Sequence, residues 1–230
     1  QLGPDLRARC EARAKAEPGN ADVLQDLAEV QARQQDYDAA LATLDKAIEL
    51  KPGDHALRFS RGDLAMEQLE SRALELRRAG KTDEASKAET DLRDLRITEY
   101  RTRIRAYPTD LNLRFKLGDL LLERGDLEPA IGEFQQTVRD PKFKSESQLR
   151  LGRAFSSKGQ YDLAIRQLEQ ALGDQTGMSA RMKEILYVLG DTWEKKGDVA
   201  QAREAYSKIY EVDINFRDVG QRLDKLASAG

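Results

Sequence analysis

Three short turns with a polar third residue divide the first half of the chain. They are Pro18-Gly19-Asn20, Pro52-Gly53-Asp54 and Pro108-Thr109-Asp110, and an amphipathic stretch follows each one. Proline ends a preceding helix, and the side-chain oxygen of Asn or Asp accepts from unpaired N–H groups at the start of the next helix. The third residues of the first two turns are 34 positions apart, and the next interval is longer by 22. The spacing predicts a repeated helical unit of 34 residues, one copy of which is enlarged.

Within these units small residues recur in register. One small position allows the two helices of a unit to approach closely, and it is occupied by Ala28, Gly118, Gly152 and Gly190. A second position, where the first helix of a unit ends, is occupied by Gly125, Gly159 and Gly197. The first unit has Gln35 there, which predicts a looser turn. A 34-residue unit of two helices with this pattern resembles the tetratricopeptide repeat, or TPR.

The resemblance implies an all-α fold: a right-handed α-α superhelix (TPR solenoid) with one elongated helical hairpin and a C-terminal capping helix. We expect a single solenoid domain over residues 1–230. Its expected parts are a partial repeat (1–20), five two-helix repeats (21–54, 55–110 elongated, 111–144, 145–182 and 183–214) and a capping helix (215–230). Within that last part, a helix is expected over 216–226 behind an Asn215 cap. Four additional residues near Gly173–Met178 predict a longer loop.

The additional residues of the elongated repeat are divided evenly between its two helices. The run Leu57-Arg58-Phe59 recurs as Leu113-Arg114-Phe115, which places the start of the repeat at His55. Gly80 then lies 11 residues beyond the expected turn, and Pro108 lies 11 residues beyond the expected end. Eleven residues are close to three helical turns, so both helices lengthen while their faces stay in phase. We expect an arm that stands out from the edge of the solenoid where the turns between the first and second helices of the repeats lie.

The arm has a narrow apolar seam. Its expected facing residues are Ala65, Leu69, Ala73 and Leu76 on the first helix and Ala85, Ala88, Leu92 and Leu95 on the second. Leu74 and Ile97 fall off this seam, which makes them candidate contacts for a partner or for a second copy of the chain. The alternative is an extended repeat that only supports the array. Both interpretations are left open by the sequence.

In proteins that the chain resembles, partners lie along the face made by the first helices, where the fifth and ninth residues of each repeat point. The fifth positions are Gln25, Phe59, Phe115, Leu149 and Tyr187, and the ninth positions are Glu29, Asp63, Asp119, Arg153 and Asp191. An apolar stripe with acidic neighbours favours a protein or peptide with apolar anchors and basic residues. Alternatively, Phe59 and Phe115 pack between adjacent helices.

A family branch that binds chaperone tails uses a clamp of lysine and asparagine for a terminal carboxylate. In this chain Phe59, Asp63, Phe115 and Asp119 stand at those positions, and the aspartates would repel a carboxylate. The sequence therefore argues against that branch of the family.

Composition and residue pattern argue against nucleic-acid binding, catalysis and metal binding. A formal net charge of −3 gives no field that would draw the chain to nucleic acid, and the arginines between 93 and 105 are interrupted by acids. Tyr100 in that stretch is expected to fill the packing position of Leu44 and Phe134. His55 beside a turn and Cys10 without a neighbouring histidine do not form a catalytic or metal-binding pattern. We expect no enzyme activity, no cofactor, no metal and no nucleic-acid partner.

No apolar run approaches the roughly 20 residues of a membrane span. A chain that begins at Gln1 with a helix already in the pattern suggests part of a longer or processed protein, and a cytoplasmic location is favoured. The predicted function is a non-catalytic scaffold that binds a peptide or protein segment on its concave face. The alternative is a structural protein that forms homo-oligomers through the long hairpin.

Overall fold

The computed structural model describes residues 4–173 and 177–228, and every regular element in these ranges is an α-helix. The chain divides into two compact units, Gln1–Pro108 and Thr109–Gly230. The all-α prediction is confirmed. The single domain over residues 1–230 stays a prediction.

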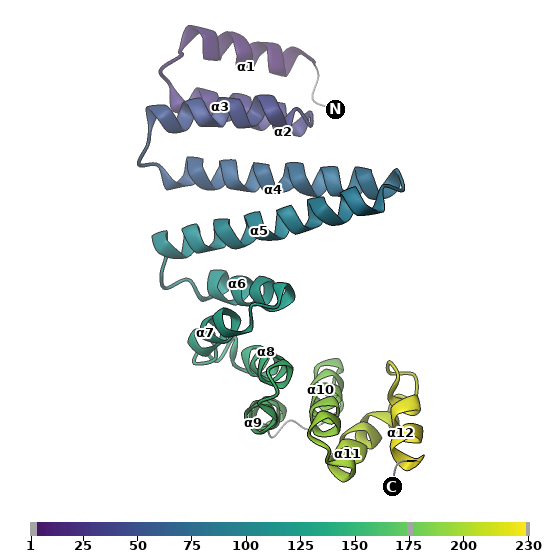
Figure 1. Ribbon diagram of the computed structural model, residues 1–230. Helices are drawn as coiled ribbons and strands as arrows, with labels where there is room; N and C mark the ends of the chain where they lie inside the picture. Colours follow the sequence, from purple (N-terminus) through teal and green to yellow (C-terminus); the bar gives the residue numbers. More distant parts are fainter. Residues whose placement is uncertain (1–3, 174–176, 229–230) are drawn as a thin grey trace. The chain divides into compact units, whose positions relative to one another are not determined.

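The first unit is a succession of helices in which each packs against the next. Its helices are α1 (Pro4–Ala16), α2 (Ala21–Arg33), α3 (Tyr37–Leu50), α4 (His55–Arg78) and α5 (Thr82–Ala106). Apolar residues of α2, α3 and α4 form one core, in which Leu24, Leu44 and Leu57 are buried. Figure 1 shows the tip of the α4–α5 hairpin projecting beyond the α2–α3 turn, as expected of an arm.

The second unit continues the two-helix pattern. Its helices are α6 (Leu111–Arg124), α7 (Leu127–Thr137), α8 (Lys144–Ser157), α9 (Tyr161–Leu172), α10 (Ala180–Lys196), α11 (Val199–Tyr210) and α12 (Val219–Ser228). Besides the contacts between consecutive helices, α8 touches both α6 and α10. The first helices of the three repeats therefore lie next to one another. Residues 174–176 of the expected loop Gly173–Met178 lie outside the described residues.

The predicted N-caps are confirmed. Side-chain oxygens of Asn20, Asp54 and Asp110 accept hydrogen bonds from the N–H groups two and three residues later, at distances from 2.8 to 3.4 Å. Each cap satisfies donors that the helix itself leaves unpaired.

Within all five two-helix units, the first helix ends in the same left-handed turn. Gly80, Gly125, Gly159 and Gly197 have φ between +72° and +91°, and Gln35 adopts φ +62°. In every case the following residue donates its N–H to the carbonyl five positions earlier, at 2.9 to 3.0 Å. The prediction of a looser first turn is therefore wrong, because Gln35 takes up the conformation that glycine adopts more easily.

Close helix approach at the small positions is confirmed in the second unit. A Cβ atom added to Gly118, Gly152 or Gly190 would lie 2.8, 2.5 or 2.6 Å from Phe134, Leu168 or Tyr206, respectively. These three large side chains are fully buried. Glycine is needed because any side chain would occupy the space of the facing residue.

The α4–α5 hairpin has the predicted turn at Gly80 and a continuous first helix. The burial of its residues agrees only in part with the prediction. Ala73, Ala85, Ala88 and Leu92 are buried in the seam as expected. Leu74 is 48% exposed, whereas Ile97 is only 1% exposed, so the expectation that Ile97 is open to a partner is wrong.

At the base of the hairpin Glu99, and not Tyr100, faces the small position. A Cβ on Gly62 would collide with the Glu99 carboxylate, which corrects the prediction that Tyr100 fills this place. Burial raises the pKa of Glu99, and the nearby negative charge of Asp63 adds to the increase against the opposing effect of Arg103.

The last helix starts later than predicted. Phe216 lies outside α12, with its ring 6.1 Å from that of Tyr187, and Arg217 has a left-handed φ of +49°. This backbone conformation interrupts the helix that Asn215 was expected to cap, so that α12 begins at Val219. Val219 and Leu226 are nevertheless buried against α11 and its neighbours, so α12 covers the end of the last repeat.

In the described part of the chain, none of the helices combines the length and the apolar character that crossing a membrane requires.

Candidate partner-binding groove

In the first unit, an arginine covers the aromatic residue at the fifth position of the elongated repeat. Nη2 of Arg103 donates to Oδ1 of Asp63 at 2.6 Å and to the carbonyl of Phe59 at 3.2 Å. The guanidinium carbon of Arg103 also lies 5.2 Å from the centre of the Phe59 ring. Phe59 further packs against Tyr107 and His55. The ring and the carboxylate are therefore both occupied by contacts within the chain.

The same arrangement recurs in the second unit at α6. Nε of Arg150 on α8 donates to Oδ1 of Asp119 at 2.8 Å, and its guanidinium carbon lies 5.8 Å from the ring centre of Phe115. Phe115 packs edge-on against the buried Phe134 and stacks on Phe143. Phe115 is thus anchored mainly within its own repeat.

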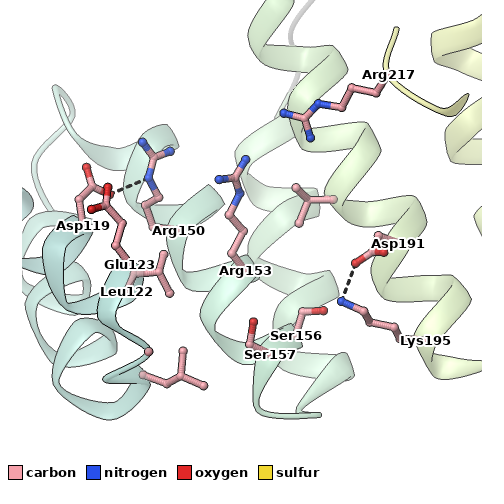
Figure 2. Close-up of a pocket in the computed structure, with 13 residues that line it drawn as sticks. Asp119, Leu122, Glu123, Arg150, Arg153, Ser156, Ser157, Asp191, Lys195 and Arg217 are labelled. Carbon is pink, nitrogen blue, oxygen red and sulfur yellow. Dashed lines mark hydrogen bonds and ion pairs between the residues drawn. The ribbon is translucent and has the colours of Figure 1, made fainter. Parts of the chain in front are cut away.

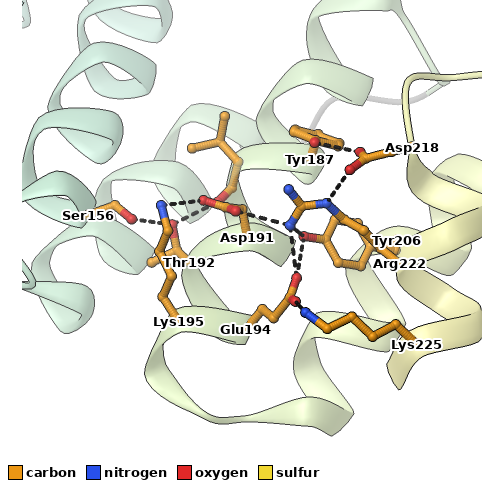
Figure 3. Close-up of polar contacts among 11 residues, drawn as sticks. Ser156, Tyr187, Asp191, Thr192, Glu194, Lys195, Tyr206, Asp218, Arg222 and Lys225 are labelled. Atoms are coloured by element: carbon orange, nitrogen blue, oxygen red, sulfur yellow. Dashed lines mark hydrogen bonds and ion pairs between the residues drawn. The ribbon is translucent and has the colours of Figure 1, made fainter. Parts of the chain in front are cut away.

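A third copy of this arrangement joins α10 to α12 (Figure 3). Nη1 of Arg222 donates to Asp191 at 3.0 Å, and the guanidinium carbon lies 5.1 Å from the ring of Tyr187. Arg222 also contacts Asp218, Glu194 and Tyr206. Burial raises the pKa of the Tyr206 hydroxyl well above its usual range. The network stabilises the packing of α12 on its neighbours.

Three of the predicted acidic neighbours, Asp63, Asp119 and Asp191, are therefore charge-paired within the chain. Leu149 is 3% exposed and belongs to the core between α8, α9 and α10, so it is not part of the stripe. Gln25 and Glu29 line a smaller pocket of about 230 Å³ in the first unit. Their role as partner contacts stays a prediction.

A larger groove of about 740 Å³ lies on the face formed by α6, α8 and α10 (Figure 2). Its charged lining residues are Asp119, Glu123, Arg150, Arg153, Asp191, Lys195 and Arg217, and Leu122, Ser156 and Val188 complete much of its wall. The structure thus brings together three predicted ninth-position residues, namely Asp119, Arg153 and Asp191. In Figure 2 the guanidinium groups of the three arginines gather along one end of the groove.

Arg153 differs from the other cations of the groove in its surroundings. Burial lowers its pKa, and the positive charges of Arg150 and Arg217 act in the same direction, whereas Glu184 raises it. Nη2 of Arg153 is ion-paired with Glu184. Its Nε, like that of Arg103, is buried and has no acceptor among the described residues. This unpaired N–H is costly but buried, so only the exposed part of the Arg153 side chain, 37% of its surface, is open to a ligand.

Arg217 was not predicted from the sequence as a site residue. Its Nη2 lies 2.6 Å from Oε2 of Glu184, and its guanidinium carbon lies 4.7 Å from the ring centre of Tyr187. No sequence signal pointed to it, because it reaches the groove through the irregular segment before α12. One carboxylate, that of Glu184, therefore serves two arginines.

The groove is suited to recognition. In the described ranges, no group of three His, Cys, Asp or Glu side chains is arranged to hold a metal ion. His55 stacks on Phe59, and Cys10 is partly buried on α1; both lie in the first unit. Guanidinium groups and carboxylates at a groove bind charged segments through directional hydrogen bonds.

Comparison with known proteins agrees with this description. Family models of the tetratricopeptide repeat match residues 7–58 and 149–215. The chain belongs to the tetratricopeptide repeat proteins, and its fold is that of protein–protein interaction scaffolds. A search of curated proteins found no match.

Several solved structures share the fold. YrrB, described as a TPR protein with an unusual peptide-binding site, has a TM-score of 0.58 at 18% identity, with 94% of this chain and 97% of YrrB covered. MamA has a TM-score of 0.54 at 22% identity, over 63% of this chain and 82% of MamA. A chain of the Cut9–Hcn1 hetero-tetramer matches with a TM-score of 0.53 at 16% identity. The match covers 96% of this chain and 38% of the matched chain. At these identities the similarity shows the fold alone.

Proposed function

We propose that this chain is a non-catalytic scaffold that binds a segment of a partner protein in the groove between α6, α8 and α10. The observation that supports this proposal most directly is the groove itself, whose volume of about 740 Å³ lies in the range of ligand pockets. It is lined by several ninth-position residues that the family resemblance assigns to partner contact. The description of YrrB as a peptide-binding TPR protein is consistent with this use of the fold.

Selection of peptides from a random display library on the immobilised chain tests the proposal. Ser157 lines the groove and is exposed, so the substitution Ser157→Trp should fill the groove and abolish binding of the selected peptides. The matched control is Ser86→Trp, which places the same side chain on the exposed surface of α5. Peptides that bind both variants equally well would show that the groove is not the binding site.

The alternative function is self-association through the α4–α5 hairpin. It is favoured by Leu74, which is 48% exposed on this hairpin. A single exposed leucine is common on soluble proteins, so this alternative has less support than the groove. Light scattering over a concentration series tests it, with Leu74→Glu as the variant. A mass that stays monomeric in the unsubstituted chain at every concentration would rule out this alternative.

A further inference from the structure

The central position of the groove departs from the pattern of its neighbours. Asp63, Asp119 and Asp191 occupy the ninth position of their repeats, whereas α8 has Arg153 there. The ninth position of the repeat that begins with α8 therefore carries a positive charge where the repeats of α6 and α10 carry a negative one. A partner that contacts this position meets a cation where the neighbouring repeats present carboxylates.

The acidic residues on either side are neutralised within the chain. Asp119 accepts from Arg150 at 2.8 Å, and Asp191 contacts Lys195 at 2.7 Å and Arg222 at 3.0 Å. These carboxylates are occupied, so a basic partner would have to displace arginines and a lysine. The expectation of a basic partner rested on these carboxylates.

The cations at the centre have fewer acceptors than donors. Each guanidinium carries five N–H groups, and the side chains of Arg153 and Arg217 share the carboxylate of Glu184. Nε of Arg153 has no acceptor among the residues that the structure describes. Arg217 keeps 47% of its side chain exposed and Arg153 keeps 37%, so both can meet a ligand. The buried Nε is out of reach of a ligand, but a second carboxylate would pair with the exposed parts of the two arginine side chains.

We propose that the groove takes an acidic segment of a partner protein, with an aspartate or glutamate side chain on the exposed parts of Arg153 and Arg217, beside the Glu184 carboxylate that already pairs with both. This inference rests on the proposed function of the groove as a peptide site. Glu123 at the α6 side disfavours a carboxylate there, which places the acidic residue at the end near α8 and α10. The inference reverses the partner charge expected from the sequence.

Fluorescence anisotropy with the full chain at physiological salt tests the proposal. Two labelled peptides of equal length carry the same leucines, blocked termini, and either glutamate or lysine at the other positions. A labelled oligothymidylate is the third probe. The variants are Arg153→Gln and Arg217→Gln, and the matched control is Arg203→Gln on the exposed surface of α11. Arg217→Gln provides an independent test should Arg153→Gln melt below the assay temperature.

The glutamate peptide should bind more tightly than the lysine peptide, and each groove variant should weaken its binding by about tenfold or more. Arg203→Gln should leave the affinity unchanged within about twofold. Tighter binding of the lysine peptide would overturn the acidic partner but leave the groove a peptide site. Absence of binding by both peptides would overturn the inference and the proposed function together. Tighter binding of the oligothymidylate, lost in the groove variants, would assign the arginines to phosphates instead.

Discussion

Nε of Arg150 on α8 donates to Oδ1 of Asp119 on α6 at 2.8 Å. Arginines of α5 and α12 repeat this relationship with Asp63 and Asp191. Each of these arginines also covers the aromatic residue four positions before the aspartate. In these three repeats the fifth and ninth positions are therefore tied together by contacts within the chain, and in the groove the charge left for a partner is set by Arg153 and Arg217.

Asp119→Asn tests whether the paired carboxylate opposes an acidic ligand. Removal of this negative charge leaves Arg150 with Glu146 as an acceptor at 2.9 Å. Binding of the glutamate peptide should strengthen by about 0.5–1 kcal/mol, and the free energy of unfolding should fall by no more than about 1 kcal/mol. Anisotropy titration and thermal melting measure the two effects. Weaker binding of the glutamate peptide would contradict the charge assignment.

Gly152→Ala tests the close approach of α8 and α9. The added methyl group would lie 2.5 Å from Cγ of the fully buried Leu168, so the free energy of unfolding should fall by about 1–3 kcal/mol. The matched control is Gly132→Ala on the exposed face of α7, where nothing lies within 4 Å. This control should raise stability by about 0.5–1 kcal/mol, because alanine is the better helix former. The changes in the free energy of unfolding, measured by chemical denaturation, should therefore have opposite signs for the two substitutions.

Gln35→Gly should stabilise the chain. Gln35 has φ +62°, a conformation that costs a residue with a Cβ about 1–2 kcal/mol. The greater freedom of glycine in the unfolded chain offsets part of this, which leaves a gain of about 0.5 kcal/mol. Gly159→Gln makes the reverse change at φ +74° and should destabilise the chain. Equal melting temperatures for both variants and the original chain would contradict the argument.

Arg222→Met should weaken the packing of the last helix. Its guanidinium lies 3.0 Å from carboxylate oxygens of Asp191 and Asp218 and 2.8 Å from one of Glu194, and all three would lose their shared cation. Because the Arg222 side chain is 23% exposed, the loss should be about 1–3 kcal/mol, below that of a fully buried ion pair. Lys225→Met, at a side chain 75% exposed, is the control and should have little effect. Urea denaturation measures both.

Glu99→Gln should stabilise the chain at neutral pH. The pKa of Glu99 is raised in the folded state, mainly by burial, so the folded chain holds this proton more tightly than the unfolded chain does. The stability associated with the protonated group is present below the unfolded pKa and is lost as pH rises through the folded pKa. The neutral amide avoids that loss. Melting temperatures measured from acidic to neutral pH should differ between the two chains by an amount that grows with pH. A difference in melting temperature that is independent of pH would contradict this.

Much of the fold was predictable because its determinants are local. The caps at Asn20, Asp54 and Asp110 act on N–H groups two and three residues away, and Gly80 needs only its own backbone conformation to end α4. The length of the α4–α5 hairpin followed from counting residues between such signals. Errors arose where a prediction required knowing which side chains meet. Ile97 is buried and Glu99 faces Gly62 because the rotation of two long helices about their axes is decided by their packing.

The sequence by itself determined the two-helix unit, its turns, the small positions of close approach and the enlarged repeat, since each depends on residues a few positions apart. Only the tertiary structure decided the chemistry of the groove. Arg150 and Arg217 line the groove and come from α8 and from the irregular segment before α12, and Arg222 of α12 pairs with Asp191, so that these arginines neutralise or replace the charges that the repeat pattern alone would present. Charge pairing depends on distances across the fold, which the spacing of residues along the chain does not contain.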